Sequence, residues 1–321
     1  MEKFFDLPEG VQFIYNSDDS TLRLSSLFGM TCGHNGTDYD YSSAGVAVLC
    51  VDDMRLEGAK LAYTFPEWDG KTFSFSAGDH GRTIRLDVVW EYDPSSGVYS
   101  CCYSLHNISG SQKTLRRALA RFVFSPGSYE VVSQTSAWCA ENQVHFQTLS
   151  GSGIHLRGRD ARSSVGNTPF CILQDQESRH SAAFHVLPRG NWVINIDQDI
   201  IQNESPRPVL EMGLADRDLF MGISPGEKIE LPEFLLHRVP QDFPEFAGVL
   251  SLGRSKDHIP GHWSGQGNIH QPDFHNPDSA ISAIPEYFSR SAVQRSHFPV
   301  HAGSILLQHP GKRPDAVPAE S

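Results

Sequence analysis

The feature that most constrains the fold of this chain is a period-2 pattern between Thr83 and Tyr92. One side of the pattern holds the apolar residues Ile84, Leu86, Val88, Trp90 and Tyr92, and the other side holds Arg85, Asp87 and Glu91. Side chains of a β-strand point alternately to its two faces, so this run predicts a half-buried strand. The same alternation recurs over residues 99–105, 182–186 and 192–196, which predicts several strands of the same kind.

Clusters of turn-forming residues separate these runs, at 93–97, 107–111 and 188–191. Short amphipathic strands joined by such turns are typical of large antiparallel sheets packed face to face. Residues 115–124 fit both helical and strand spacing, and the flanking strands favour a strand. The continuous apolar run 45–51 predicts a strand buried on both faces. Helix is expected to be rare, and the predicted fold class is all-β.

The charge and composition of the chain limit the kinds of partner that it could bind. The 321 residues carry a formal net charge of −12, whereas a nucleic-acid partner requires a basic surface. The chain starts without a long apolar segment, and no run approaches the ~20 apolar residues that a membrane span needs. We therefore expect a cytoplasmic chain that binds neither nucleic acid nor membrane.

The composition changes after Gly248, where Pro, Gly, Ser and His become frequent. This change predicts a β-domain over residues 1–246 and a His/Pro-rich tail over 247–321 that is largely irregular or disordered. Seven of the fifteen histidines lie in the tail: His258, His262, His270, His275, His297, His301 and His309. A metal site needs ligands that converge from ordered elements, and no glycine-rich phosphate loop follows a strand, so no metal or cofactor is expected.

Five segments, in this order along the chain, carry a family resemblance. They are Leu105–Gly110 with Leu115–Leu119, Tyr129–Glu141, Ser163-Ser164 with Pro169-Phe170, Gly190–Trp192, and Pro225–Glu227 with Pro232-Glu233. Together they resemble the N-terminal domain of the family-36 glycoside hydrolases, the bacterial and plant-type α-galactosidases. The chain departs from the family pattern at Val165, where a histidine is common, and at Ala140, where a basic residue is common.

The resemblance implies a large antiparallel β-supersandwich of the galactose-mutarotase-like type. It also implies that the catalytic pair is absent, because family members carry two catalytic aspartates on a (β/α)8 barrel. This chain has its tail where that barrel begins, and no catalytic residue is predicted in it. In some oligomeric members the domain lends a loop to the active site of a neighbouring subunit.

Three side chains are candidates for carbohydrate contact: Trp138, Asp53 and Arg55. Trp138 lies in a less regular, polar stretch, whereas Trp90 and Trp192 occupy inward strand positions and are assigned to the core. Asp53 and Arg55 match the family vaguely, and the simpler interpretation is a surface ion pair between them.

The leading hypothesis is a non-catalytic module that supports a catalytic barrel, supplied by a separate chain, and builds homo-oligomer contacts. One alternative is a stand-alone, lectin-like module that binds galactosides. A second is a fragment of an active α-galactosidase that hydrolyses terminal α-galactosides.

Overall fold

The computed structural model describes residues 1–33, 46–137, 140–158, 166–188, 190–199, 206–214 and 219–239. The chain divides into two compact units, Met1–Pro260 and Gly261–Ser321. All described residues belong to the first unit. The predicted tail over 247–321 and its boundary at residue 246 lie outside the described residues.

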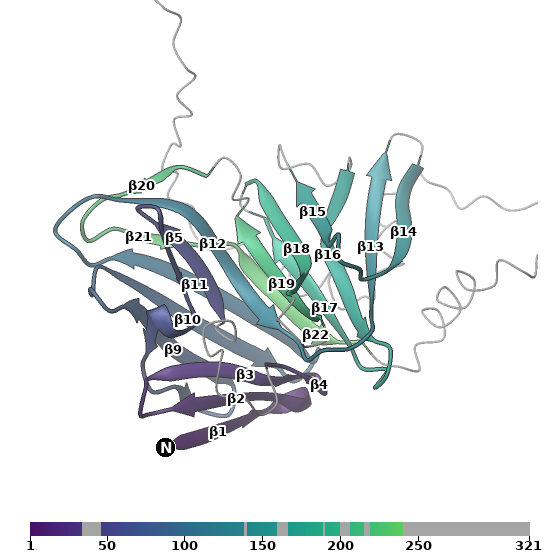
Figure 1. Ribbon diagram of the computed structural model, residues 1–321, viewed down its shortest axis with the longest axis horizontal. Helices are drawn as coiled ribbons and strands as arrows, with labels where there is room; N and C mark the ends of the chain where they lie inside the picture. The colour runs from purple at the N-terminus through teal and green to yellow at the C-terminus, as the bar shows by residue number, and fades with distance from the viewer. Residues whose placement is uncertain are drawn as a thin grey trace, which may run out of the picture. The chain divides into compact units, whose positions relative to one another are not determined.

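Strands in three antiparallel sheets make up nearly all of the described structure (Figure 1). The four-stranded sheet contains β1 (Glu2–Leu7), β2 (Val11–Asn16), β3 (Thr21–Leu27) and β4 (Met30–Thr31). The seven-stranded sheet contains β15 (Ile154–Gly158), β18 (Trp192–Asp199), β19 (Arg207–Leu214), β12 (Lys113–Val123), β5 (Ala47–Val51) and β6 (Met54–Glu57) in spatial order, with β20 (Met221–Ile223) beside β12.

The eleven-stranded sheet is the largest. In spatial order it contains β14 (Ala140–Thr148), β13 (Tyr129–Ala137), β16 (Gly166–Asp175), β17 (Ser181–Leu187), β22 (Glu233–Arg238), β11 (Val98–Asn107), β10 (Ile84–Asp93), β9 (Thr72–Asp79) and β7 (Leu61–Tyr63), with β21 (Lys228–Glu230) beside β11 and β8 (Glu67–Trp68) beside β9. The helical segments of the described residues are two 3-10 turns, Pro8–Gly10 and Gly58–Lys60. None of the described helices has the length and hydropathy to cross a membrane.

The alternation in the sequence matches the burial of the strands. In β10 all five predicted apolar positions are buried, with Trp90 only 1% exposed, while Arg85 and Val89 face outward. Cys101 and Cys102 point to opposite faces of β11, one buried and one exposed. The predictions of an all-β fold and of inward-facing strand residues are confirmed.

The ambiguous segment around residues 115–124 is a strand, β12, as predicted. Phe122 points into the core, with ring centroids 6.3 Å from Trp90 and 5.3 Å from Phe184 of the large sheet. On the opposite face, Leu119 contacts Val48 and Val193 in a small buried cluster. Both faces of the seven-stranded sheet therefore carry buried apolar groups, which agrees with the continuous apolar run at β5.

The four-stranded sheet adds aromatic residues to the same core. The ring of Phe13 stacks on Phe73 at 4.5 Å between centroids and meets Trp90 edge-on at 5.0 Å. Aromatic pairs in these geometries contribute about 0.5–1.5 kcal/mol each beyond the area that they bury. The first thirty residues are thus an integral part of the β-domain.

The strand β22 joins the two halves of the large sheet, because it pairs with β17 on one side and with β11 on the other. The turn Pro225–Glu227 precedes it and is fixed to Asn107 at the end of β11. Gly226 N–H donates to the Asn107 carbonyl at 2.8 Å, and the Asn107 side chain donates to the Ile223 carbonyl at 2.8 Å. This turn, which belongs to one of the five segments that carry the family resemblance, therefore anchors the approach to β22 at the end of β11.

Candidate functional site

The hairpin between β5 and β6 carries two of the three predicted carbohydrate contacts. Val51 pairs with Met54, so Asp52 and Asp53 form a two-residue turn, with φ angles of 50° and 63°. Positive φ at both positions is the signature of the type I′ turn, in which aspartate is tolerated. The turn is tied to β12, since Asp52 accepts a 2.8 Å hydrogen bond from Thr114 N–H. A rigid sheet therefore positions the tip of this hairpin.

The predicted ion pair between Asp53 and Arg55 is wrong, because each residue bonds to another partner. Asp53 lies 2.7 Å from the Arg116 guanidinium, at the start of β12. Arg55 forms two hydrogen bonds to Glu57, of 2.7 and 2.8 Å. Residues two apart on a strand share a face, which brings Arg55 to Glu57 and leaves Asp53 in the turn.

An exposed aromatic side chain completes the tip of the hairpin. The Arg116 guanidinium lies over the ring of Phe220 at 4.9 Å from its centroid. Phe220 is 71% exposed, the Asp53 side chain is 77% exposed and Met54 is 50% exposed. We call Asp53, Met54, Arg116 and Phe220 the hairpin cluster. It offers a carboxylate acceptor, a guanidinium donor and an apolar ring face, which are the groups that contact the hydroxyls and the ring of a sugar.

No local pattern marks Arg116 or Phe220 as a neighbour of Asp53, because residues 53, 116 and 220 meet only when the sheet has formed. Trp138, the third predicted contact, lies outside the described residues. Trp90 and Trp192 are 1% and 3% exposed, so their assignment to the core is confirmed.

Charges near the hairpin are compensated locally. The hydrogen bond from Lys113, and then the one from Thr114, hold the pKa of Asp52 below its usual value. Further along the outer face of the seven-stranded sheet, Arg121 bridges Glu57 and Glu211. Burial raises the pKa of Glu211, and the neighbouring arginines offset this only in part. These groups form a partly buried ion network, in which removal of one partner would leave an uncompensated charge.

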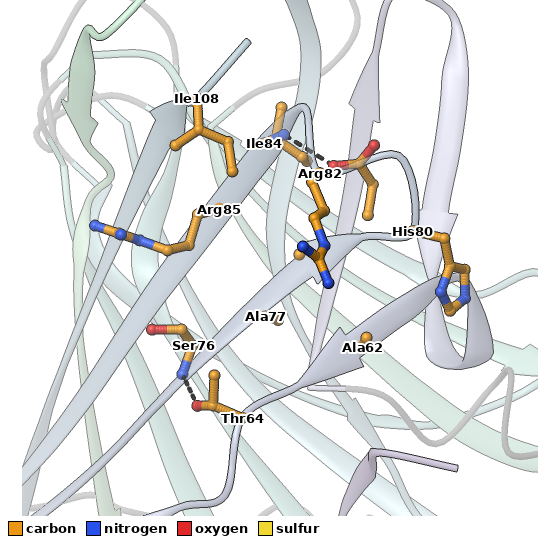
Figure 2. Close-up of a pocket in the computed structure, with 11 residues that line it drawn as sticks. Ala62, Thr64, Ser76, Ala77, His80, Arg82, Ile84, Arg85 and Ile108 are labelled. Carbon is orange, nitrogen blue, oxygen red and sulfur yellow. Dashed lines mark hydrogen bonds between the residues drawn. The ribbon is translucent and has the colours of Figure 1, made fainter.

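A hollow of about 460 Å³ lies at the edge of the large sheet, beside β7, β9 and β10 (Figure 2). Its floor includes the small residues Ala62, Ala77 and Gly78, and its rim carries His80, Arg82, Arg85 and Ile108. In the part of the chain that the structure describes, no group of three or more His, Cys, Asp or Glu side chains is arranged to hold a metal ion.

Comparison with known proteins identifies the sequence family. Residues 17–205 match the profile described as the glycosyl hydrolase family 36 N-terminal domain. A search of curated protein sequences gives no significant match.

Several solved structures share this fold. The galactosidase domain of the α-galactosidase-sucrose kinase AgaSK has a TM-score of 0.59 and 13% identity, covering 74% of this chain and 40% of that one. The α-galactosidase from Lactobacillus brevis has a TM-score of 0.59 and 13% identity, covering 75% and 39%. The α-galactosidase AgaA from Geobacillus stearothermophilus has a TM-score of 0.59 and 15% identity, covering 75% and 41%. The chain thus spans about two fifths of the length of these proteins.

Proposed function

Because the chain belongs to the family of glycosyl hydrolase family 36 N-terminal domains, we propose that it is a non-catalytic β-sandwich module that supports a catalytic α-galactosidase-like domain. The match to solved α-galactosidases supports this proposal, since it covers only about 40% of their length. The family resemblance found in the sequence is confirmed, and the role of the module follows from it as an inference.

The positions of the carboxylates support a non-catalytic role. A glycosidase needs two carboxyl groups on either side of one bond. The buried carboxylates of the described residues are Asp79 and Glu211, and they belong to different sheets. Asp79 accepts hydrogen bonds from Thr83 and Ile84 N–H, and Glu211 is paired with Arg121. Each of these carboxylates is thus held by hydrogen bonds or an ion pair within its own sheet.

The hairpin cluster is the part of the module that we propose to reach a sugar. Asp53 and Arg116 can exchange part of their mutual ion pair for hydrogen bonds to sugar hydroxyls, because an exposed pair contributes only about 0–1 kcal/mol. Phe220 would pack against the apolar face of the same ring. The sugar would be held mainly by the catalytic domain, of the same assembly or of a neighbouring subunit.

The first test is an assay of this chain alone with a nitrophenyl α-galactoside. We expect no release of nitrophenol above the blank. Release that is abolished by a single Asp→Asn substitution would show an active site in this chain and would favour the alternative of an active α-galactosidase fragment.

The second test mixes the chain with a separately produced catalytic barrel of a family 36 α-galactosidase. Size-exclusion chromatography with light scattering should show a stable complex, and the same experiment on the chain alone reports homo-oligomers. Within the complex, Asp53→Asn and Phe220→Ala should raise KM without changing the amount of complex. Glu67→Gln is the matched control, since Glu67 is exposed on β8 in another sheet. Absence of any complex would contradict the supporting role.

A second candidate function is a stand-alone, lectin-like module. The exposed ring of Phe220 beside Arg116 and Asp53 favours it, whereas burial of Trp90 and Trp192 removes two aromatic platforms. Calorimetric titration of the chain alone with galactose or melibiose decides between the two. A saturable isotherm that is lost in Phe220→Ala would support the lectin-like module.

A further inference from the structure

The hollow beside β7, β9 and β10 contains one cationic side chain that is not neutralised. Arg85 is paired with Asp87, with nitrogen–oxygen distances of 3.0 and 3.1 Å. Among the residues that the structure describes, the Arg82 guanidinium has no ion-pair or hydrogen-bond partner. In Figure 2, Arg82 reaches toward the floor of the hollow near Ala77, while the guanidinium of Arg85 points away from it.

The other charged groups around the hollow do not compensate Arg82. The carboxylate of Asp79 accepts hydrogen bonds from Thr83 N–H, Thr83 Oγ1 and Ile84 N–H, at 2.7, 2.9 and 2.8 Å. Burial alone would raise the pKa of Asp79, but these bonds outweigh it, and the pKa lies below its usual value. The carboxylate is thus ionised and directed at the turn backbone.

The turn holds Arg82 in a fixed position. Its N–H donates to the Asp79 carbonyl at 2.9 Å, and its φ angle is 53°, in the left-handed region that non-glycine residues occupy at a cost of roughly 1–2 kcal/mol. The Asp79 hydrogen bonds to Thr83 and Ile84 brace the same turn. A cationic side chain on a braced turn above a small-residue floor is a preorganised arrangement for one ligand group.

We propose that this hollow binds a small molecule that carries an oxyanion, a carboxylate or a phosphate, with Arg82 as the residue that holds the charged group. A guanidinium donates two parallel hydrogen bonds to either oxyanion. The volume of about 460 Å³ falls within the range typical of small-molecule sites. The floor of Ala62, Ala77 and Gly78 leaves space for a compact body, and Ile108 supplies an apolar wall. This inference does not depend on the proposed supporting role.

The test uses the full chain and three sugars that differ in one group: D-galacturonate, D-galactose 6-phosphate and D-galactose. Calorimetry or ligand-observed NMR measures each Kd. The two charged sugars should bind more tightly than galactose, and added salt should weaken the binding of the charged sugars. Whichever of the two charged sugars binds more tightly shows whether the hollow prefers a carboxylate or a phosphate.

The Arg82→Gln substitution should raise the Kd of both charged sugars at least about tenfold, which is the effect of losing a charge-assisted hydrogen bond. The Kd of galactose should not change. Arg179→Gln is the matched control, because Arg179 is also an exposed turn residue at positive φ (64°) but does not line the hollow. Equal binding of galactose and the charged sugars, equal effects of the two substitutions, or no saturable binding of any of the three would overturn the proposal.

Discussion

Gly158 lies opposite Trp192 in the seven-stranded sheet, and the indole covers the position where a side chain would begin. A Cβ atom at Gly158 would lie 1.8 Å from Trp192 Nε1. Gly158→Ala therefore forces the buried indole to move, and overpacking of this kind reduces the free energy of unfolding by about 1–3 kcal/mol. Urea unfolding measures the change. Gly110→Ala, with no atom within 4 Å of its Cβ position, is the control and should change stability little. Equal midpoints for Gly158→Ala and the wild type would contradict the packing described here.

The half-buried imidazole of His185 makes stability depend on pH. Burial, and then the neighbouring charge of His237, lower the pKa of His185 to about 4 from its ordinary 6.5. The unfolded chain then binds more protons than the folded one between these values. The contribution of His185 is complete above about pH 6.5 and is lost as pH falls toward 4, at most about 3 kcal/mol.

His185→Gln should flatten this part of the pH dependence, measured by urea unfolding at a series of pH values. The wild type, measured in the same series, gives the reference slope. A slope that is unchanged by His185→Gln would mean that the imidazole titrates normally.

Residue positions in strands could be predicted from the sequence, but their partners could not. Trp90 and Trp192 were assigned to the core because alternation alone decides the face of a strand. The partners of Asp53 and Arg55 depend on the turn geometry and on Arg116, which is distant in sequence. Phe220 has no local pattern that marks it as exposed beside that arginine.

At the scale of elements, the turn of the β5–β6 hairpin should be more stable with glycine than with alanine in place of Asp53, which is the reverse of the usual order. Asp53 has a φ angle of 63°, where glycine is unstrained and alanine is not. Asp53→Gly should therefore be more stable than Asp53→Ala by about 1 kcal/mol, although alanine stabilises most other sites relative to glycine. Thermal unfolding of the two variants measures the difference. Greater stability of the alanine variant would contradict a type I′ turn at this position.

The order of the strands is the part of the fold that periodicity could not predict. Alternation located β10, β11, β17 and β18, and the turn residues marked where several strands end. No local sequence pattern indicates that β22 lies between β17 and β11. Neighbouring strands pair through backbone hydrogen bonds, which do not require a particular sequence. The ion network of Arg121, Glu57 and Glu211 likewise depends on the order β19-β12-β5-β6 in the seven-stranded sheet, which no local pattern predicts.

At the scale of the whole molecule, limited proteolysis tests the predicted domain boundary. Residues after Gly248 contain much Pro, Gly, Ser and His, so they offer little apolar surface to offset the cost of ordering the backbone. Chymotrypsin, which can cut after Phe246 and Leu250, should cut first between residues 240 and 321 and leave a resistant fragment that ends near residues 239–250, identified by mass spectrometry. First cuts within residues 84–196 would show that the boundary is wrong.

The central position of β22 has a consequence for synthesis on the ribosome. The chain emerges from its N-terminus, so both halves of the large sheet leave the exit tunnel before the strand that joins them. Until Glu233–Arg238 has emerged, β17 and the Val98–Cys101 part of β11 lack their common partner. Unpaired strand edges of this kind pair readily with other chains. Nascent chains that stall before residue 233 should therefore depend on chaperones that cover strand edges.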